Sequence, residues 1–242
     1  MIGLGTIVNF AAIILGGTAG VLVKQGLPER FKTTIMQCLG LAVTIIGVSG
    51  ALQGIFQVIE GNKLDRLYIT GMIFSLVLGS ILGELLKIED RLDRLGEWFQ
   101  QRFAKGESTF AKGFVTASLV YCVGAMAIVG ALEDGLSQKT DLLFAKSILD
   151  GVSAIVFSAT LGWGVVFSAI PILVYQGSIT LLANIVKPLL TDAVISQMSL
   201  VGGVLIMAIG FNLLEIKRFK VGNMLPAVLM PLIFQLVTLI VK

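Results

Sequence analysis

Long apolar segments alternate with short charged connections along this chain of 242 residues. A helix that crosses a bilayer needs about 20 consecutive, mostly apolar residues. Windows of that length give eight candidate spans, at residues 4–23, 35–58, 67–87, 113–133, 142–160, 164–186, 197–215 and 222–241. The pattern therefore predicts an all-α fold, a polytopic transmembrane helical bundle of about eight spans.

One long polar segment, residues 88–112, interrupts the apolar pattern. Residues 88–103 place apolar side chains at helical spacing and charged ones on the other face, which is typical of a helix lying on the inner membrane surface. A gate or a helix that docks a partner is the alternative. We expect one integral membrane domain: the first membrane helices in 1–87, the amphipathic helix and a linker in 88–112, and the remaining membrane helices in 113–242.

The composition agrees with a membrane setting. Hydrophobic residues make up 56% of the chain, charged residues only 14%, and 28 residues are glycine. The mean hydropathy is +0.95. The net charge is only +3, and the basic residues are scattered between the apolar segments, which argues against a nucleic-acid partner.

The residue types present argue against catalysis. The chain has no histidine, which removes imidazole metal sites and Ser-His arrangements. No phosphate-binding loop with its Lys-Ser/Thr pair occurs. Cys38 and Cys122 both fall inside apolar segments, so a disulfide is not expected. We expect a protein without enzyme activity, metal or cofactor.

The basic residues predict the orientation of the spans, because the inner loops of membrane proteins are richer in Lys and Arg. With the N-terminus outside, twelve of the 18 basic residues fall in inner loops. Both termini are therefore expected outside, with 88–112 in the cytoplasm. No cleavable signal peptide is expected, since Lys24, the first basic residue, follows the first apolar run. The uncharged turn at 161–164 leaves open whether spans five and six both cross or form one re-entrant hairpin.

A short pattern recurs near the ends of the first and third spans. Leu-Gly-x3-Gly-x-Leu-x-Lys occurs at residues 15–24 and again at 78–87, and the following spans match more weakly. This indicates an internal repeat of parallel helix hairpins, with the amphipathic segment inserted into the second copy. Convergent GxxxG packing is the alternative. The glycine faces are also candidate contacts for a homo-oligomer, and they comprise Gly16, Gly20, Gly79 and Gly83.

Three stretches carry a resemblance to a known family. They are GTIVNFAAIILGGTAG at residues 5–20, LDG at 149–151, and FSAIPILVYQGSITLLA at 167–183. They resemble the bacterial membrane family called domain of unknown function 554, and the likeness runs along the full length of the chain. The resemblance implies a multi-pass protein of the bacterial inner membrane, loosely described as a possible transporter, and it supplies no functional residues.

Asp150 is the charge that most needs an explanation. It precedes a run of 36 residues, 151–186, without any charged side chain. Counted from Asp141, it lies roughly 13 Å along the helix. Lys146, one turn earlier on the same face, is the nearest partner. Asp150 either forms a structural bridge with Lys146 or binds a cation or proton in a pathway, and Lys146 either pairs with it or extends outward to water.

Further polar residues lie within the spans and complete the candidate binding set. They are Asn9, Glu84, Tyr175, Gln176 and Asn212. Glu84 is close to Lys87 at the inner end of its span, where interfacial solvation would suffice. The asparagine amides either cross-link helices or bind a solute.

Proline and glycine predict helix breaks in two spans. Pro171 and Gly177 flank Tyr175 and Gln176, so backbone carbonyls released there could coordinate a cation. An ordinary proline kink is the alternative. Pro226 and Pro231 predict a bend in the last span.

These features together favour a secondary transporter or exporter of a small solute or ion. The solute would bind near the midplane, between spans five and six and the first hairpin. The alternatives are an ion channel lined by the same residues, or a non-transporting scaffold that docks a cytoplasmic partner on 88–112. The channel is less favoured because no ring of acids and no filter sequence occurs. A cation, an amino-acid-like zwitterion and proton coupling all remain compatible with the polar set.

Overall fold

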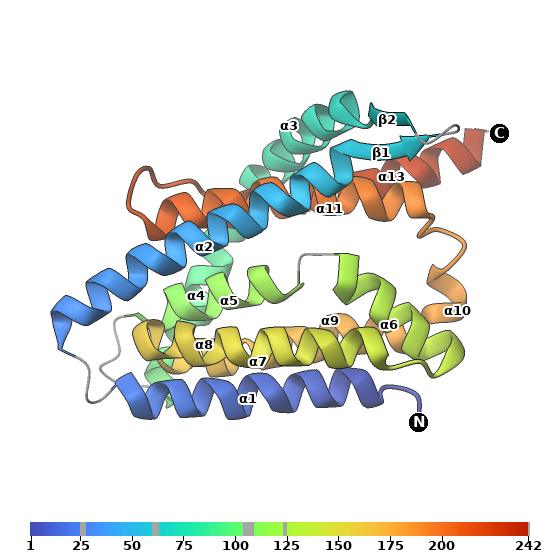
Figure 1. The fold of residues 1–242 in the computed structure, drawn as a ribbon. Helices are drawn as coiled ribbons and strands as arrows, with labels where there is room; N and C mark the ends of the chain where they lie inside the picture. The colour runs from blue at the N-terminus through green and yellow to red at the C-terminus, as the bar shows by residue number, and fades with distance from the viewer. Residues whose placement is uncertain (25–27, 60–62, 104–108, 123–124, 242) are drawn as a thin grey trace. The chain divides into compact units, whose positions relative to one another are not determined.

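A computed structural model describes residues 1–24, 28–59, 63–103, 109–122 and 125–241 (Figure 1). The fold is helical, as predicted, with one two-stranded hairpin. The helices are α1 Leu4–Lys24, α2 Glu29–Ile55, α3 Ile69–Leu86, α4 Ile88–Phe103, α5 Phe110–Cys122, α6 Ala125–Ser137, α7 Asp141–Leu161, α8 Trp163–Phe167, α9 Ala169–Leu181, α10 Ala183–Val186, α11 Asp192–Leu213, α12 Val221–Met224 and α13 Pro226–Val241.

The hairpin follows α2 and consists of β1 Phe56–Ile59 and β2 Lys63–Arg66, which pair antiparallel. The second span was expected to continue to residue 58, and it ends instead at Ile55. Four-residue strands are too short for an apolar window to separate from a preceding helix, and this explains the difference.

The chain forms two compact units that are interleaved along the sequence. Unit 1 comprises Met1–Leu39, Arg91–Cys122 and Met126–Asn184, and unit 2 comprises Gly40–Asp90, Val123–Ala125 and Ile185–Lys242. The division into 1–87, 88–112 and 113–242 follows membrane segments rather than compact units, and it stays a prediction.

In unit 1, α1 lies along α7 and also contacts α8 and α9 (Figure 1). Gly16 meets the backbone of Gly151, and Gly20 meets that of Ile155, so the two helices run in the same direction. A Cβ at either glycine would overlap a carbonyl oxygen of α7. Small residues here allow the backbones to touch, as is common for helices in lipid.

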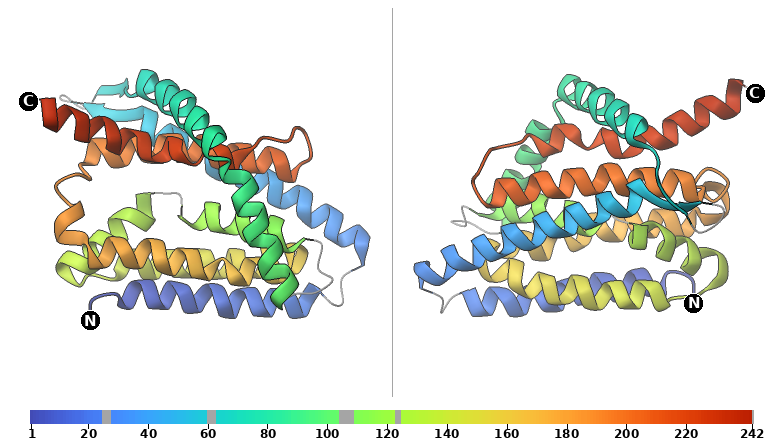
Figure 2. Two further views of the ribbon diagram at one scale, coloured as in Figure 1. Left: turned by 180° about the vertical axis from the view of Figure 1, so that it is seen from behind. Right: turned by 45° about the horizontal axis from the view of Figure 1, so that its top comes forward.

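In unit 2, α3 packs on α12 and α13, which run in the opposite direction (Figure 2). Gly79 meets Ala227, and Gly83 meets the backbone of Asn223. All four glycines of the repeated pattern therefore face helices of the same chain, and their contact with a second copy stays a prediction.

The second seam of unit 2 joins α2 to α11. Gly47 meets Met207 and Gly54 meets Leu200, so these two helices also run in opposite directions. Helix α11 also has a small residue at this seam. Gly203 lies against Gly47 and Gly50.

Seven helical segments are long and apolar enough to cross a membrane among the described residues, and α5 with α6 can form an eighth. This eighth span differs from the fourth predicted span, residues 113–133. A single helix was expected there, and the structure instead has two helices, α5 and α6, bent by 61° relative to each other. Each of the two has 13 residues, about 20 Å, which is too short to cross alone.

Many apolar side chains on these helices point outward. On α3 they include Phe74, Val77 and Leu85, and on α7 Ile148 and Val152, each more than half exposed. Apolar surface of this extent requires a lipid or protein neighbour.

The helix breaks lie beside the predicted positions. Gly162, with a positive φ of 76°, ends α7, and Ser168 separates α8 from α9. Pro171 is the third residue of α9, where a missing N–H costs no hydrogen bond. The break expected at Gly177 is absent, since α9 continues through it.

The last span is also divided. Pro226 is the first residue of α13, after the short α12. A proline at this position fits a helix start, because its φ angle is already helical. Pro231 lies inside α13, and the helix continues past it.

Candidate functional site

A buried ion pair lies at the centre of unit 1. Lys146 Nζ donates to Asp150 Oδ2 at 2.7 Å, within one turn of α7. The two residues are 7% and 6% exposed, so Lys146 pairs with Asp150 and does not extend to the surface. Burying both charges is tolerable only because each neutralises the other.

Two amides extend this pair across three helices. Asn9 of α1 donates through Nδ2 to Asp150 Oδ2 at 3.0 Å and to Gln176 Oε1 of α9 at 3.2 Å. Asn9 and Gln176 are both 0% exposed. We refer to Asn9, Lys146, Asp150 and Gln176 as the α7 polar cluster.

The carboxylate determines how both amides are oriented. An ionised Asp150 only accepts hydrogen bonds, so Asn9 must present its NH₂ group to it. The same NH₂ group faces Gln176, which must therefore present its carbonyl oxygen. One acceptor, Asn9 Oδ1, and one donor group, Gln176 Nε2, remain buried without a partner among the described residues.

Such atoms are unusual in a folded protein. An unpaired buried polar group costs about 1–3 kcal/mol, and native structures contain only a few. Here two of them belong to adjacent amides within one hydrogen-bonded cluster. The arrangement can bind a small polar species that supplies the missing partners.

Hydroxyl groups continue the polar contacts toward the N-terminal end of α1. Thr6 Oγ1 and Thr180 Oγ1, on α1 and α9, lie 3.5 Å apart and are both buried. In the other direction along α1, the buried Ile13 is followed by the contact of Gly16 with Gly151. Polar groups are buried on this side as well: Ser153 Oγ donates to Tyr121 Oη at 3.4 Å, and Ser158 is 0% exposed.

Asp134 is a buried acid that the sequence did not indicate. It is 0% exposed, and its two carboxylate oxygens accept from Gly3 N at 3.1 Å and Gly5 N at 3.0 Å. These N–H groups belong to the start of α1, so the carboxylate caps that helix and faces the positive end of its dipole. It lies just after the predicted span 113–133, and nothing in the sequence links it to residues 3–5.

The remaining candidates make contacts of their own. In unit 2, Glu84 accepts from Lys220 Nζ at 3.0 Å and from Asn223 Nδ2 at 2.6 Å. The hydrogen bond that Lys220 donates to Glu84 raises the pKa of Lys220 above its ordinary value. Asn212 bonds both backbone groups of Phe219, which closes the loop between α11 and α12.

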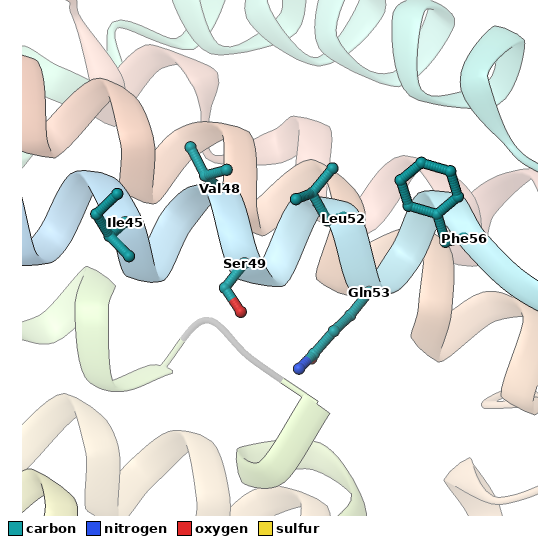
Figure 3. A pocket seen from close by; sticks show the side chains of 6 residues that line it. All are labelled: Ile45, Val48, Ser49, Leu52, Gln53 and Phe56. Carbon is teal, nitrogen blue, oxygen red and sulfur yellow. The ribbon is translucent and has the colours of Figure 1, made fainter.

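Two surface hollows lie apart from the cluster residues. One, of about 620 Å³ in unit 1, is lined by Phe114, Ile170, Pro171, Val174, Tyr175, Ser178 and Ile179, so Tyr175 lines it rather than the cluster. The other, of about 490 Å³, lies along α2 and is lined by Ile45, Val48, Ser49, Leu52, Gln53 and Phe56 (Figure 3). Both linings are mainly apolar and suit lipid chains better than a polar solute.

The acidic residues that the structure describes do not gather into a metal site. No group of three His, Cys, Asp or Glu that could hold a metal ion occurs in the part of the chain that the structure describes. Cys38 and Cys122 are not joined to each other.

The apolar spans and the buried cluster define a multi-pass membrane protein with an ionic group inside its helical bundle. Residues 4–236 match the family described as "Protein of unknown function (DUF554)", and the chain belongs to this family. The resemblance read from residues 5–20, 149–151 and 167–183 is thereby confirmed.

Two relatives are similar over nearly their whole length. "Uncharacterized membrane protein YdfK" of Bacillus subtilis (strain 168) is 33% identical over 227 residues, which cover 94% of this chain and 93% of the relative. "Uncharacterized protein YqgA" of Escherichia coli (strain K12) is 31% identical over 232 residues, 94% of each. No solved structure matches the chain.

Proposed function

We propose that the protein is a secondary transporter or exporter of a small solute or ion, and that Asp150 is its coupling or binding group. The observation that carries this proposal is the α7 polar cluster, in which an ion pair and two unpartnered amide atoms are buried together. Charged residues inside membrane bundles are costly and commonly mark solute or proton pathways. Under this proposal the protein is a carrier and not an enzyme.

A carrier fits better than a channel because the sequence has no ring of acids and no filter signature of the kind that lines a selective pore. The close backbone contact of Gly16 with Gly151 also leaves no room for a hydrated path between α1 and α7 at that level. A conducting pore requires polar or hydrated positions along its whole length. An alternating-access carrier is expected to be closed on one side at a time.

The proposed orientation places both termini outside the bacterial inner membrane and α4 at the cytoplasmic surface. Its support is the Lys and Arg distribution together with helix direction within each unit. The parallel pair α1 and α7 and the antiparallel pairs α2–α11 and α3–α13 fit eight alternating spans. Helix α7 has 21 residues, about 32 Å, and residues 163–181 add 19 more, which favours two full crossings over a re-entrant hairpin.

The internal repeat remains part of the proposal. Both copies of the glycine pattern form close helix contacts, which also suits the convergent alternative. Their partner helices run in opposite senses, parallel for α1 and antiparallel for α3. A duplication would therefore have retained the glycine pattern and changed its partner.

Flux measurements in proteoliposomes test the proposal. We expect protein-dependent movement of a small solute or of protons in the native chain and its loss in Asp150→Asn. The matched control is Asp141→Asn, an exposed acid at the start of the same helix, which should keep full flux. Unchanged flux in Asp150→Asn would make Asp150 structural and this mechanism wrong.

Single-channel recording in a planar bilayer separates carrier from channel, since a carrier gives no unitary current steps. The scaffold alternative has its own test. If removal of residues 88–112 abolishes a cellular phenotype that Asp150→Asn leaves intact, docking on α4 and not transport is the function.

A further inference from the structure

We propose that the α7 polar cluster is a proton-dependent site for a small planar anion of the carboxylate type, in which the side chain of Asp150 occupies the anion position until it is protonated. The inference rests on the proposed function for its biological purpose and specifies the substrate class of that site.

The first support is the excess of nitrogen donors. Asp150 Oδ2 is held by Lys146 Nζ and Asn9 Nδ2 at 2.7 and 3.0 Å. Gln176 Nε2 is a third, unpartnered donor group in the same cluster. A cation such as Ca²⁺ or Mg²⁺ requires six or more oxygen ligands, whereas a carboxylate is recognised by converging N–H groups.

The second support is the charge balance. Lys146 and Asp150 sum to zero, so a bound anion alone would leave an uncompensated charge in a buried site. That cost is several kcal/mol. If Asp150 takes up one proton from water as the anion enters, the anion replaces it as the counterion of Lys146. The net charge of the site is then again zero.

Protonation also releases the donors that the anion needs. A neutral Asp150 is a weaker acceptor, so Lys146 Nζ and Asn9 Nδ2 become available to the incoming anion. The new hydroxyl of Asp150 is a donor, and Asn9 Oδ1 is a buried acceptor without a partner among the described residues. Proton and anion would therefore bind together and leave together.

Asp150 is the one acid in the cluster, and a second buried acid, Asp134 of α6, is held by Gly3 N and Gly5 N. On α7 the charged neighbour is Lys146, and α5 contributes Tyr121 and Cys122 within electrostatic range. Helix α1 contributes the amide of Asn9, and α8, with the sequence WGVVF, has no titratable residue. Helix α9 contributes Gln176, and its Tyr175 lies near Cys122.

Nitrate is a suitable probe, because it is planar like a carboxylate and does not titrate. The thermal unfolding midpoint of the full chain in detergent, measured against nitrate concentration at several pH values, gives the affinity. In the native protein we expect affinity to fall by up to about tenfold per pH unit as Asp150 ionises, since one proton is linked to binding.

Two variants and a control test the assignment. Asp150→Asn, which resembles the protonated side chain, should bind nitrate equally at each pH. Lys146→Met should lose binding, and Asp141→Asn should behave as the native chain does. Nitrate binding that is independent of pH in the native protein, binding retained in Lys146→Met, or stabilisation by sodium or glycine in place of nitrate would overturn the inference.

A flux measurement distinguishes a failure of the anion site from a failure of the proposed transport function. An inward nitrate gradient should acidify proteoliposomes that contain entrapped pyranine, and Asp150→Asn should lose this coupled flux although it still binds nitrate. Proton-linked nitrate binding without any flux would remove the transporter and keep the anion site. Movement of sodium or glycine without nitrate binding would keep the transporter and remove the anion site.

Discussion

The two compact units bury very different interiors. All but two of the buried polar and charged residues among those described lie in unit 1, and the exceptions in unit 2 are Ser75 and Asn223. Both units nevertheless use the same packing device, close contacts at glycine. The units thus share a way of packing and differ in what they enclose.

This difference separates assembly from chemistry. Glycine seams need no polar group, since van der Waals contact between backbones holds helices together in lipid. Unit 2 shows that such seams suffice, and its ionic residues Glu84 and Lys220 remain exposed. Helix packing of this kind does not by itself call for a buried ion pair such as that of unit 1.

The largest effect is expected from separating the buried pair. Lys146→Met leaves the Asp150 carboxylate buried without its counterion and should lower the free energy of unfolding by about 3–5 kcal/mol. In Lys146→Met/Asp150→Asn the new amide oxygen can still accept from Asn9, so most of that loss should return. Unfolding in mixed micelles measures both. A loss below about 1 kcal/mol in the single variant would show that the carboxylate is hydrated.

The glycine seams should respond alike in the two units. Gly16→Leu in unit 1 and Gly83→Leu in unit 2 force a side chain onto backbone atoms, and each should cost about 1–3 kcal/mol or more. Thermal unfolding in detergent provides the measurement.

Gly177→Ala is the matched control for the seams, because nothing lies within 4 Å of its added Cβ and α9 continues through it. It should stabilise the chain by about 0.5–1 kcal/mol. A seam substitution as harmless as this control would contradict the packing described here.

A smaller effect is expected at the cap of α1. Asp134→Ala removes the acceptor for Gly3 N and Gly5 N and should cost about 1–2 kcal/mol. Hydrogen exchange should accelerate at these amides while the rest of α1 stays protected. Asp134→Asn, which keeps one acceptor oxygen, should lose less, and equal losses in both variants would refute the capping role.

The smallest effect belongs to the exposed pair of unit 2. Lys220→Met should lower the thermal midpoint only slightly, because solvent and salt screen the pair. Since the pKa of Lys220 is raised in the folded state, its contribution is present at neutral pH and is lost as the pH rises through that pKa. Melting curves of the native chain and the variant should converge in alkaline buffer, and a difference that persists there would exclude the ion pair as its cause.

The sequence predicted the helical class and the members of the cluster, but not their pairing. Periodicity and the missing charges in 151–186 indicated the spans, and polar residues inside them were few enough to identify individually. Which amide meets which carboxylate depends on tertiary packing, since Asn9 and Asp150 are 141 positions apart. Asp134 was missed for the same reason.

The helix breaks lie near the predicted positions, but the role expected of the prolines needed correction. A proline predicts either a kink or a helix start, and both Pro171 and Pro226 lie in the first turn of a helix. The residue at which a helix stops depends on capping geometry, such as the positive φ of Gly162, that a single sequence does not specify.

Infrared difference spectroscopy of the native protein with and without nitrate tests most directly whether Asp150 is an exchangeable counterion of Lys146. We expect nitrate to produce the carbonyl band of a protonated carboxylic acid, present in Asp141→Asn and absent in Asp150→Asn. A spectrum without that band while nitrate is bound, or a band that persists in Asp150→Asn, would contradict it.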